Sequence, residues 1–418
     1  MPAITTPSPA TKASQARAVV WLDSTRMDGA NLYRQLFPDL AGQIDFQMVD
    51  RSQFPAEILR FNQEGQGWPD AVFAETNLIA QTVDSRHDFP LDLKPVLPAE
   101  VLGNFEPHAH DACTFGDKLL CLRHDTAPMV LYFNKPLMDQ FGYQVPTTWE
   151  AYQALGERLS REHPGYVLGS FGDAWGFKTY FDASGCPSSW VLDDKKVYIN
   201  FGEARCVRAA RLVDALLANG SLAPYGCFDP RFNQIARDDK LLMLVGPAWM
   251  ALASFGGKPG NQYYETADHQ LGVAAPLRWD GEARAMTSTM GGGAWAVSKH
   301  TQSLSVVLGF ITWMVSAPEF WVTTPDYPVY VPVQKPWEKA LASNPLFANN
   351  PFPAMQAASQ AISPLYVLPK YDVMGLLDDV VNRALTQHKT VESLLPDLQT
   401  EMTARAQSAG YQVTLDIK

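Results

Sequence analysis

The sequence has little charge and no basic cluster. Of its 418 residues 18% are charged, and 33 Lys and Arg stand against 44 Asp and Glu, a formal net charge of −11. Nucleic acids and anionic membranes are bound through clustered positive charge, so neither is an expected partner. The longest apolar-rich stretch, residues 303–315, is shorter than the ~20 apolar residues of a spanning helix.

Motifs that carry catalysis or cofactors are also missing. There is no Gly-x-Ser-x-Gly elbow, no P-loop and no His-Glu-x-x-His, and Gly65-Gln-Gly67 lacks the third glycine of a dinucleotide fingerprint. Gly291-Gly-Gly293 has no lysine at P-loop spacing, which favours a hinge or tight turn over an anion cradle. His108-Ala-His110-Asp111 has metal-ligand residue types without a further ligand, which favours a solvated loop. We therefore expect neither a metal nor a cofactor.

The five cysteines are too few for a disulfide scaffold, and none forms a Cys-x-x-Cys pair. Cys113 and Cys121 enclose a turn-like stretch, Cys186 and Cys206 enclose a longer loop, and Cys227 is left over. Spacing alone leaves two interpretations open: a disulfide across each pair, or five reduced and mostly buried thiols.

Apolar and polar runs alternate in the pattern of an α/β fold. Strands are predicted at 17–24, 44–49 and 70–75, with helices at 31–40 and 54–64 between them. This order predicts a parallel sheet covered by helices, which binds ligands at the carboxyl ends of its strands. Further strands are predicted at 128–134, 241–245, 271–275 and 291–298, and further helices from Thr147 and at 206–219, 303–316, 371–386 and 391–408.

The N-terminal segment, residues 1–16, is rich in Pro, Thr, Ser and Ala. It has no apolar run of the kind that a signal peptide needs, so no signal peptide is predicted in this chain. We expect a disordered leader there.

Aromatic residues beside glycine or proline are the strongest indication of a binding site. Aromatic faces stack on the C–H faces of sugar rings, while Asp, Glu and Asn bind hydroxyl groups. The set therefore predicts a carbohydrate site, although each ring taken alone is equally well explained as a core residue. The candidates are Trp175, Trp249, Trp295, Tyr327, Tyr330 and Tyr366.

Longer motifs run through most of the chain. They are Gly67-Trp-Pro-Asp-Ala-Val-Phe73, Val130-Leu-Tyr-Phe-Asn-Lys-Pro-Leu137, Val145-Pro-Thr-Thr-Trp-Glu-Ala-Tyr152, Leu244-Val-Gly-Pro-Ala-Trp249 and Gly291-Gly-Gly-Ala-Trp-Ala-Val-Ser298. Together they resemble the extracellular solute-binding proteins of ABC importers, the maltose-binding-protein-like family of carbohydrate uptake. The Asn-Lys-Pro-Leu and Pro-Thr-Thr-Trp-Glu combination is specific for the family, whereas none of the motifs is specific for a ligand.

The resemblance implies a two-lobed α/β fold of the periplasmic-binding-protein-like type II class. Its lobes are discontinuous, hinge crossings join them, and the ligand binds in the cleft between them. The implied N-terminal lobe spans 17–125 and 293–327, and the C-terminal lobe spans 128–288 and 332–418. The implied hinges lie near 125–128, 288–292 and 325–331.

The resemblance also places ligand-binding positions on the chain. They are Glu75, Thr76, Asn77, Asp125 and Trp249, with Gly292 at the second crossing and Tyr327 and Tyr330 at the third. Asp23 is added because it ends the first predicted strand, and Trp175, Trp295 and Tyr366 are added for their chemistry and placement. Because the family is exported, the resemblance favours the disulfides Cys113–Cys121 and Cys186–Cys206.

The function implied by the resemblance is that of the substrate-binding component of an ABC transporter. Such a protein captures a sugar or oligosaccharide and delivers it to membrane permease subunits without chemistry of its own. We expect a monomer in the periplasm or outside the cell, with a lipid anchor left open.

Two other functions stay open. The first is binding of another small solute: a polyol, a glycerophosphodiester or a peptide. A phosphate group would need a cationic side chain as its partner, for which Arg26 and Arg123 are the candidates. The second is a glycoside-processing enzyme, which needs two carboxylates facing one bond.

Overall fold

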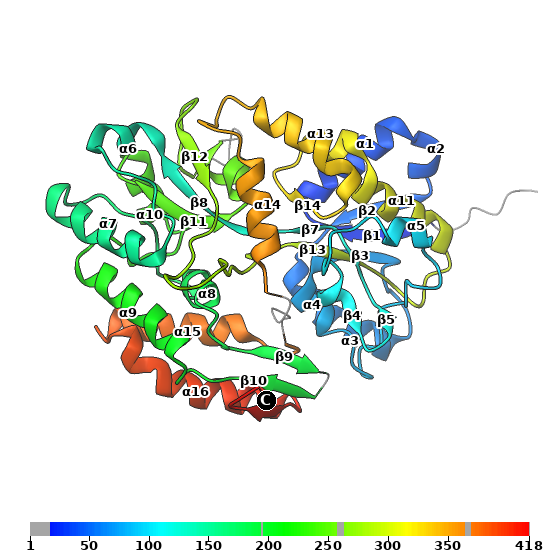
Figure 1. Cartoon of the computed structure of the whole chain (residues 1–418). Helices are drawn as coiled ribbons and strands as arrows, with labels where there is room; N and C mark the ends of the chain where they lie inside the picture. Colours follow the sequence, from blue (N-terminus) through cyan, green and yellow to red (C-terminus); the bar gives the residue numbers. More distant parts are fainter. Residues whose placement is uncertain (1–16, 194, 257–262, 364–368, 418) are drawn as a thin grey trace, which may run out of the picture.

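The first of two α/β lobes is built on a five-stranded sheet. The structure is a computed structural model that describes residues 17–193, 195–256, 263–363 and 369–417. The strand order is β2–β1–β3–β13–β6. Figure 1 labels β2, β1, β3 and β13. β1, β2 and β3 run parallel, while β13 is antiparallel to both β3 and β6. The bounds are β1 (Ala18–Leu22), β2 (Ile44–Met48), β3 (Ala71–Glu75), β6 (Leu122–Arg123) and β13 (Gly293–Val297).

Helices cover this sheet and bury its apolar faces. The core between them holds Phe73, Trp295, Phe310 and Trp321, all fully or almost fully buried. The helices are α1 (Ser24–Leu36), α2 (Pro38–Ala41), α3 (Phe54–Glu64), α4 (Thr76–Ala80), α5 (Ala99–Leu102), α11 (Leu304–Ser316) and α12 (Pro318–Trp321), with 3₁₀ turns η1 (Arg51–Gln53) and η2 (Asp111–Cys113). A small hairpin, β4 (Thr114–Phe115) and β5 (Lys118–Leu119), completes the lobe.

The second lobe has two three-stranded sheets (Figure 1). β8 pairs antiparallel with both β11 and β12, and β10 pairs with β9 and with the C-terminal strand β15. The strands are β8 (Met129–Asn134), β9 (Trp190–Asp193), β10 (Lys196–Tyr198), β11 (Met243–Pro247), β12 (Leu271–Ala274) and β15 (Gln412–Thr414).

Helices of the second lobe pack into two cores. One lies around Trp149 and Phe177, the other around Tyr132 and Trp337. The helices are α6 (Lys135–Phe141), α7 (Trp149–Glu162), α8 (Ala174–Ala183), α9 (Ala204–Ala218), α10 (Pro230–Arg237), the π-helix η3 (Ala251–Phe255), α13 (Val331–Ala342), α14 (Phe352–Ala361), α15 (Val373–Thr386) and α16 (Val391–Ser408). No helix within the described ranges is long and apolar enough to cross a membrane.

Most predicted elements are present, and the differences trace to helix caps. The helix predicted at 31–40 begins at Ser24, because the Asp23 carboxylate caps it by accepting from the Arg26 amide at 2.8 Å. It ends at Leu36, just before the Phe37-Pro38 step that disfavours helical backbone.

The sequence also predicts a capping box of Thr147 and Glu150 for one helix, and caps at Thr76 and Asn77 for another, and both predictions are wrong. Thr148, not Thr147, caps α7, and the Glu150 carboxylate accepts from the Asp280 amide instead of closing a capping box. Glu75 occupies the N-cap position of α4, but no side chain accepts a hydrogen bond from the first amides of that helix. Thr76 and Asn77 are therefore the first helical residues and not the cap.

Three chain passages lie beside one another between the lobes. β7 (Asp125–Thr126) pairs antiparallel with β14 (Tyr327–Pro328), and Pro128 bridges to Thr289. Figure 1 shows β7 and β14 at the junction of the lobes. These pairings support the implied hinges, whose positions and lobe boundaries stay predictions.

Both predicted disulfides are present. Cys113 and Cys121 close an eight-residue separation around the β4–β5 hairpin, and Cys186 and Cys206 join the end of α8 to α9 across a separation of 20. Cys227 is free and buried. The interpretation with five reduced thiols is therefore wrong for four of them.

We expect each disulfide to stabilise its own lobe. Loop-closure entropy gives roughly 2.5 kcal/mol for the shorter loop and roughly 3 kcal/mol for the longer one. Urea unfolding of the Cys113→Ala/Cys121→Ala and Cys186→Ala/Cys206→Ala variants measures each loss. Reductant should destabilise the wild type and leave a variant lacking both pairs unchanged; equal stability of the wild type with and without reductant would contradict the prediction.

Candidate ligand-binding site

Two adjoining cavities between the lobes form what we call the central cleft. The first has a volume of about 860 Å³, and the second, of about 790 Å³, shares Arg51, Glu75 and Trp175 with it. Charged side chains of the first lobe border one side, and aromatic side chains of the second lobe border the other. The principal lining residues are Asp23, Arg26, Arg51, Glu75, Asp125, Asp326, Trp175, Phe228, Trp249 and Gly292, with Thr76 and Asn77 in the second cavity.

Arg26 forms the floor of the charged side. It lies in the first turn of α1 and is 5% exposed. Its Nη2 atom is 3.1 Å from carboxylate oxygens of both Asp125 and Asp326, and its Nη1 atom is 3.4 Å from Asp23. The guanidinium also lies 3.9 Å from the ring centre of Phe73, a cation–π distance. Three carboxylates of the protein therefore neutralise this cation, although its buried Nε atom has no hydrogen-bond partner among the described residues.

Asp125 links Arg26 to the start of β13, the strand that follows Gly291 and Gly292. Its Oδ1 atom accepts from Arg26 and, at 2.8 Å, from the amide of Gly293. Burial raises the pKa of Asp125, against the opposing effect of the Arg26 charge. The carboxylate thus depends on Arg26 for its charge at neutral pH.

Arg51 is the second cation of the cleft, and it is also paired. Its Nη1 atom lies 3.0 Å from Asp23, and its Nη2 atom lies 3.0 Å from Glu75. Both arginines of the central cleft are therefore neutralised by acids of the protein itself. Because the lining of the two cavities holds five acids, Asp50 included, against three cations, Lys178 included, an additional anion here would meet net negative charge.

The opposite wall is aromatic. Trp249 and Phe228 are stacked, with ring centres 6.0 Å apart and planes 6° apart. The indole N–H of Trp249 donates to the carbonyl of Met290 at 2.9 Å, which fixes the ring. Trp175 joins this wall from the first turn of α8, whose cap is Asp173. The wall offers flat apolar faces across from hydrogen-bonding carboxylates.

Gly292 allows the chain to pass close to the charged floor. Its φ is +82°, and a Cβ atom there would lie 2.8 Å from Nη2 of Arg123 and 3.1 Å from the carbonyl of Asp125. Only glycine fits this position without displacement of its neighbours.

Eight predicted site residues border the central cleft, and their contact with a ligand stays a prediction. They are Asp23, Glu75, Thr76, Asn77, Asp125, Trp175, Trp249 and Gly292. Tyr366 lies outside the described residues.

The other three predicted aromatic residues are buried and line neither cavity of the central cleft, so the structure does not bring them to it. Trp295 is 0% exposed in the middle of β13, with its indole N–H donating to Nδ1 of His124. Tyr327 is also 0% exposed, and its hydroxyl donates to Glu106 at 2.8 Å. Tyr330 packs against Phe105 with ring centres 5.2 Å apart. Each ring fills a core and presents no free face.

Arg51, Phe228 and Asp326 also border the central cleft and are not among the residues predicted from the sequence, where Arg26 is a candidate only for binding phosphate. Arg51 follows β2, so the rule that singled out Asp23 after β1 also finds it. Phe228 lies between α9 and α10 with no pattern around it, and only the folded chain brings it to Trp249.

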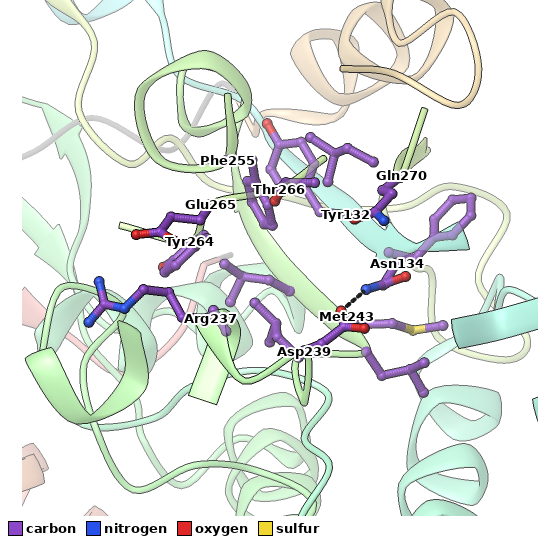
Figure 2. Close-up of a pocket in the computed structure, with 16 residues that line it drawn as sticks. Tyr132, Asn134, Arg237, Asp239, Met243, Phe255, Tyr264, Glu265, Thr266 and Gln270 are labelled. Atoms are coloured by element: carbon purple, nitrogen blue, oxygen red, sulfur yellow. Dashed lines mark hydrogen bonds between the residues drawn. The ribbon is translucent and has the colours of Figure 1, made fainter. Parts of the chain in front are cut away.

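A separate cavity of about 650 Å³ lies inside the second lobe (Figure 2). Tyr132, Phe255 and Tyr264 line it, and Asn134 donates to Asp239 at 2.8 Å. It shares no lining residue with the central cleft.

We expect Arg26→Gln to destabilise the fold by about 3–5 kcal/mol, because buried carboxylates lose their counter-ion. The loss should be greater at pH 8 than at pH 5. Burial raises the pKa of Asp125 even beside Arg26, and removal of the Arg26 charge raises it further, so the folded variant binds more protons than the wild type and loses more stability as pH rises.

Urea unfolding at both pH values measures this. The exposed Arg60, paired with Glu57 and Glu64 on α3, provides the control Arg60→Gln, with an expected change under about 1 kcal/mol. Equal losses for the two variants would contradict the role of Arg26.

Comparisons with known proteins agree with this architecture. The profile of the family described as bacterial extracellular solute-binding protein matches residues 63–319. No curated protein sequence matches the chain.

Solved structures show the same fold at low identity. The galacto-N-biose-/lacto-N-biose I-binding protein of an ABC transporter from Bifidobacterium longum, in complex with lacto-N-biose, is 17% identical with a TM-score of 0.77, covering 97% of this chain and 100% of that one. The ABC-transporter-associated binding protein of B. animalis subsp. lactis Bl-04, in complex with beta-1,6-galactobiose, is 17% identical with a TM-score of 0.75, covering 96% and 99%. The cyclic alpha-maltosyl-1,6-maltose binding protein of Arthrobacter globiformis is 16% identical with a TM-score of 0.72, covering 94% and 99%. With more than half of its length matched by the family profile, the chain belongs to the bacterial extracellular solute-binding proteins.

Proposed function

We propose that this chain is the carbohydrate-binding component of an ABC importer and that an uncharged sugar ring binds in the central cleft. One observation carries this proposal. An aromatic wall faces carboxylates that are already paired with Arg26 and Arg51 of the protein itself. A sugar ring fits such a site, because its C–H face stacks on indole and its hydroxyls donate to carboxylates.

The similar structures support the carbohydrate assignment. Two are complexes with disaccharides, and the third is named for the sugar that it binds. We further propose that the protein is exported to the periplasm or the cell exterior, is a monomer and delivers its ligand to permease subunits; the family's description as extracellular solute-binding protein supports the export.

Hinge closure would couple binding to delivery. A ligand that touches both walls of the central cleft binds the closed form better than the open form, and so shifts the population towards it. The three passages that contain β7, β14 and residues 289–293 are where this motion is proposed to occur.

The alternative functions fit the site less well. A phosphate in the central cleft would find both arginines already paired with carboxylates. A glycoside-processing enzyme would need an acid free to donate a proton, whereas Asp23 and Glu75 both hold Arg51. We therefore propose binding without turnover.

A thermal-shift panel of neutral sugars, polyols, glycerophosphates and peptides tests the proposal. At 100–1,000 times Kd a ligand should stabilise the protein by about 3–4 kcal/mol, a shift of several degrees. A sugar that shifts the transition and is recovered intact supports the proposal. Shifts with phosphates or peptides alone, or hydrolysis of the sugar, would overturn it.

We expect Trp249→Ala and Trp175→Ala to raise the Kd of a sugar found in this panel roughly 10–30-fold, because each variant removes a stacking face. Titration calorimetry measures the change. Trp68→Ala is the control. Trp68 is also half-buried, but it lies away from the cleft and stacks on His300 with ring centres 3.9 Å apart. If all three variants bind alike, the aromatic wall does not contact the ligand.

A further inference from the structure

A third interlobe cavity adjoins the central cleft. It has a volume of about 1,190 Å³ and shares Thr76 and Thr289 with the central cleft. Arg123 and Thr126 line it from the first lobe and hinge, and Gln360 lines it from α14 of the second lobe. We call it the outer cavity.

Arg123 is the unusual residue of the outer cavity. It lies at the end of β6 and is 3% exposed. Its Nε atom donates to the carbonyl of Asp125 at 2.7 Å, and its two Nη groups have no hydrogen-bond or ion-pair partner within the ranges that the structure describes. Arg26 and Arg51, by contrast, each hold two or more carboxylates.

The position of the guanidinium links the two spaces. Its Nη2 atom lies beside Gly292, where a Cβ would approach to 2.8 Å, and Gly292 itself borders the central cleft. Arg123 therefore lies in the wall between the central cleft and the outer cavity. Asp125 acts on Arg123 electrostatically, but no carboxylate of the described residues lies within ion-pair distance of its Nη groups, so this buried cation favours an anion from outside.

The other polar groups of the outer cavity do not provide that counter-ion. Glu106 accepts hydrogen bonds from Tyr327, Gln334 and Ser359, and Asp111 pairs with His108 at 2.9 Å. Thr126 has a buried hydroxyl with no partner among the described residues. Glu106 and Asp111 therefore already have partners, whereas the Nη groups of Arg123 and the hydroxyl of Thr126 have none among the described residues.

We propose that the outer cavity binds a carboxylate, held by the Nη groups of Arg123 with the Thr126 hydroxyl as a second donor. A planar guanidinium matches a carboxylate through two parallel hydrogen bonds. The carboxylate belongs either to a small free acid or to the acidic end of a glycan whose uncharged ring occupies the central cleft. The second source rests on the proposed function.

Calorimetry on the whole protein with acetate, glucuronate, glucose, cellobiose and cellobiouronate separates these sources. We expect a carboxylate to bind at least tenfold more tightly than its neutral counterpart, and Arg123→Gln to abolish the preference. Arg123→Lys should retain part of it, and the surface variant Arg60→Gln should retain all of it.

The pattern of hits identifies the ligand. Arg123-dependent binding of acetate or glucuronate indicates a free acid, and binding of cellobiouronate alone indicates an acidic glycan. Binding of acetate with no response to any sugar, neutral or acidic, would uphold the outer cavity while overturning the carbohydrate function. Equal affinity for acid and neutral forms, no carboxylate binding, or binding unchanged in Arg123→Gln would overturn the carboxylate site.

A structural role for Arg123 predicts a different result. Arg123→Gln would then unfold at lower temperature without a change in ligand preference. Should that variant fail to fold, Thr126→Val serves instead, because it removes an unpartnered hydroxyl at nearly constant shape and should not reduce stability. We expect it to weaken carboxylate binding several-fold; unchanged affinity would count against the site.

Discussion

The guanidinium of Arg26 lies where three distant parts of the chain meet, and its ion pairs hold them in register. Asp23 follows the first strand, Asp125 begins β7, and Asp326 immediately precedes β14. Buried ion pairs of this kind add little net stability, since desolvation offsets the Coulomb attraction. They do penalise any arrangement that separates the partners. Arg26 thereby ties the start of α1 to the beginnings of β7 and β14.

This constraint also shapes the chemistry of the cleft. Because Arg26 and Arg51 are held by Asp23, Asp125 and Glu75, the first lobe presents acceptors to a ligand more than it presents charge. The second lobe contributes the stacked rings of Trp249 and Phe228. Under the proposed function, a sugar ring that touches both walls gains more than one that touches either wall alone.

The sequence predicts the strands and part of the site for a clear physical reason. Buried parallel strands are continuous apolar runs, and polar residues after them, such as Asp23 and Glu75, gather at one edge of the sheet. The orientation of an aromatic ring is not encoded locally. Trp295 follows three glycines, yet β13 already begins at Gly293, and the strand turns the indole into the core. Phe228 has no local signal, because only tertiary packing brings it to the cleft.

The two disulfides are distributed so that each lies inside one lobe. Cys113–Cys121 belongs to the core of the first lobe, and Cys186–Cys206 belongs to a core of the second. Neither ties one lobe to the other. Covalent reinforcement is therefore confined to the two bodies and absent from the joint, which leaves the stiffness of each lobe and the ease of their relative rotation as independently adjustable properties of the chain.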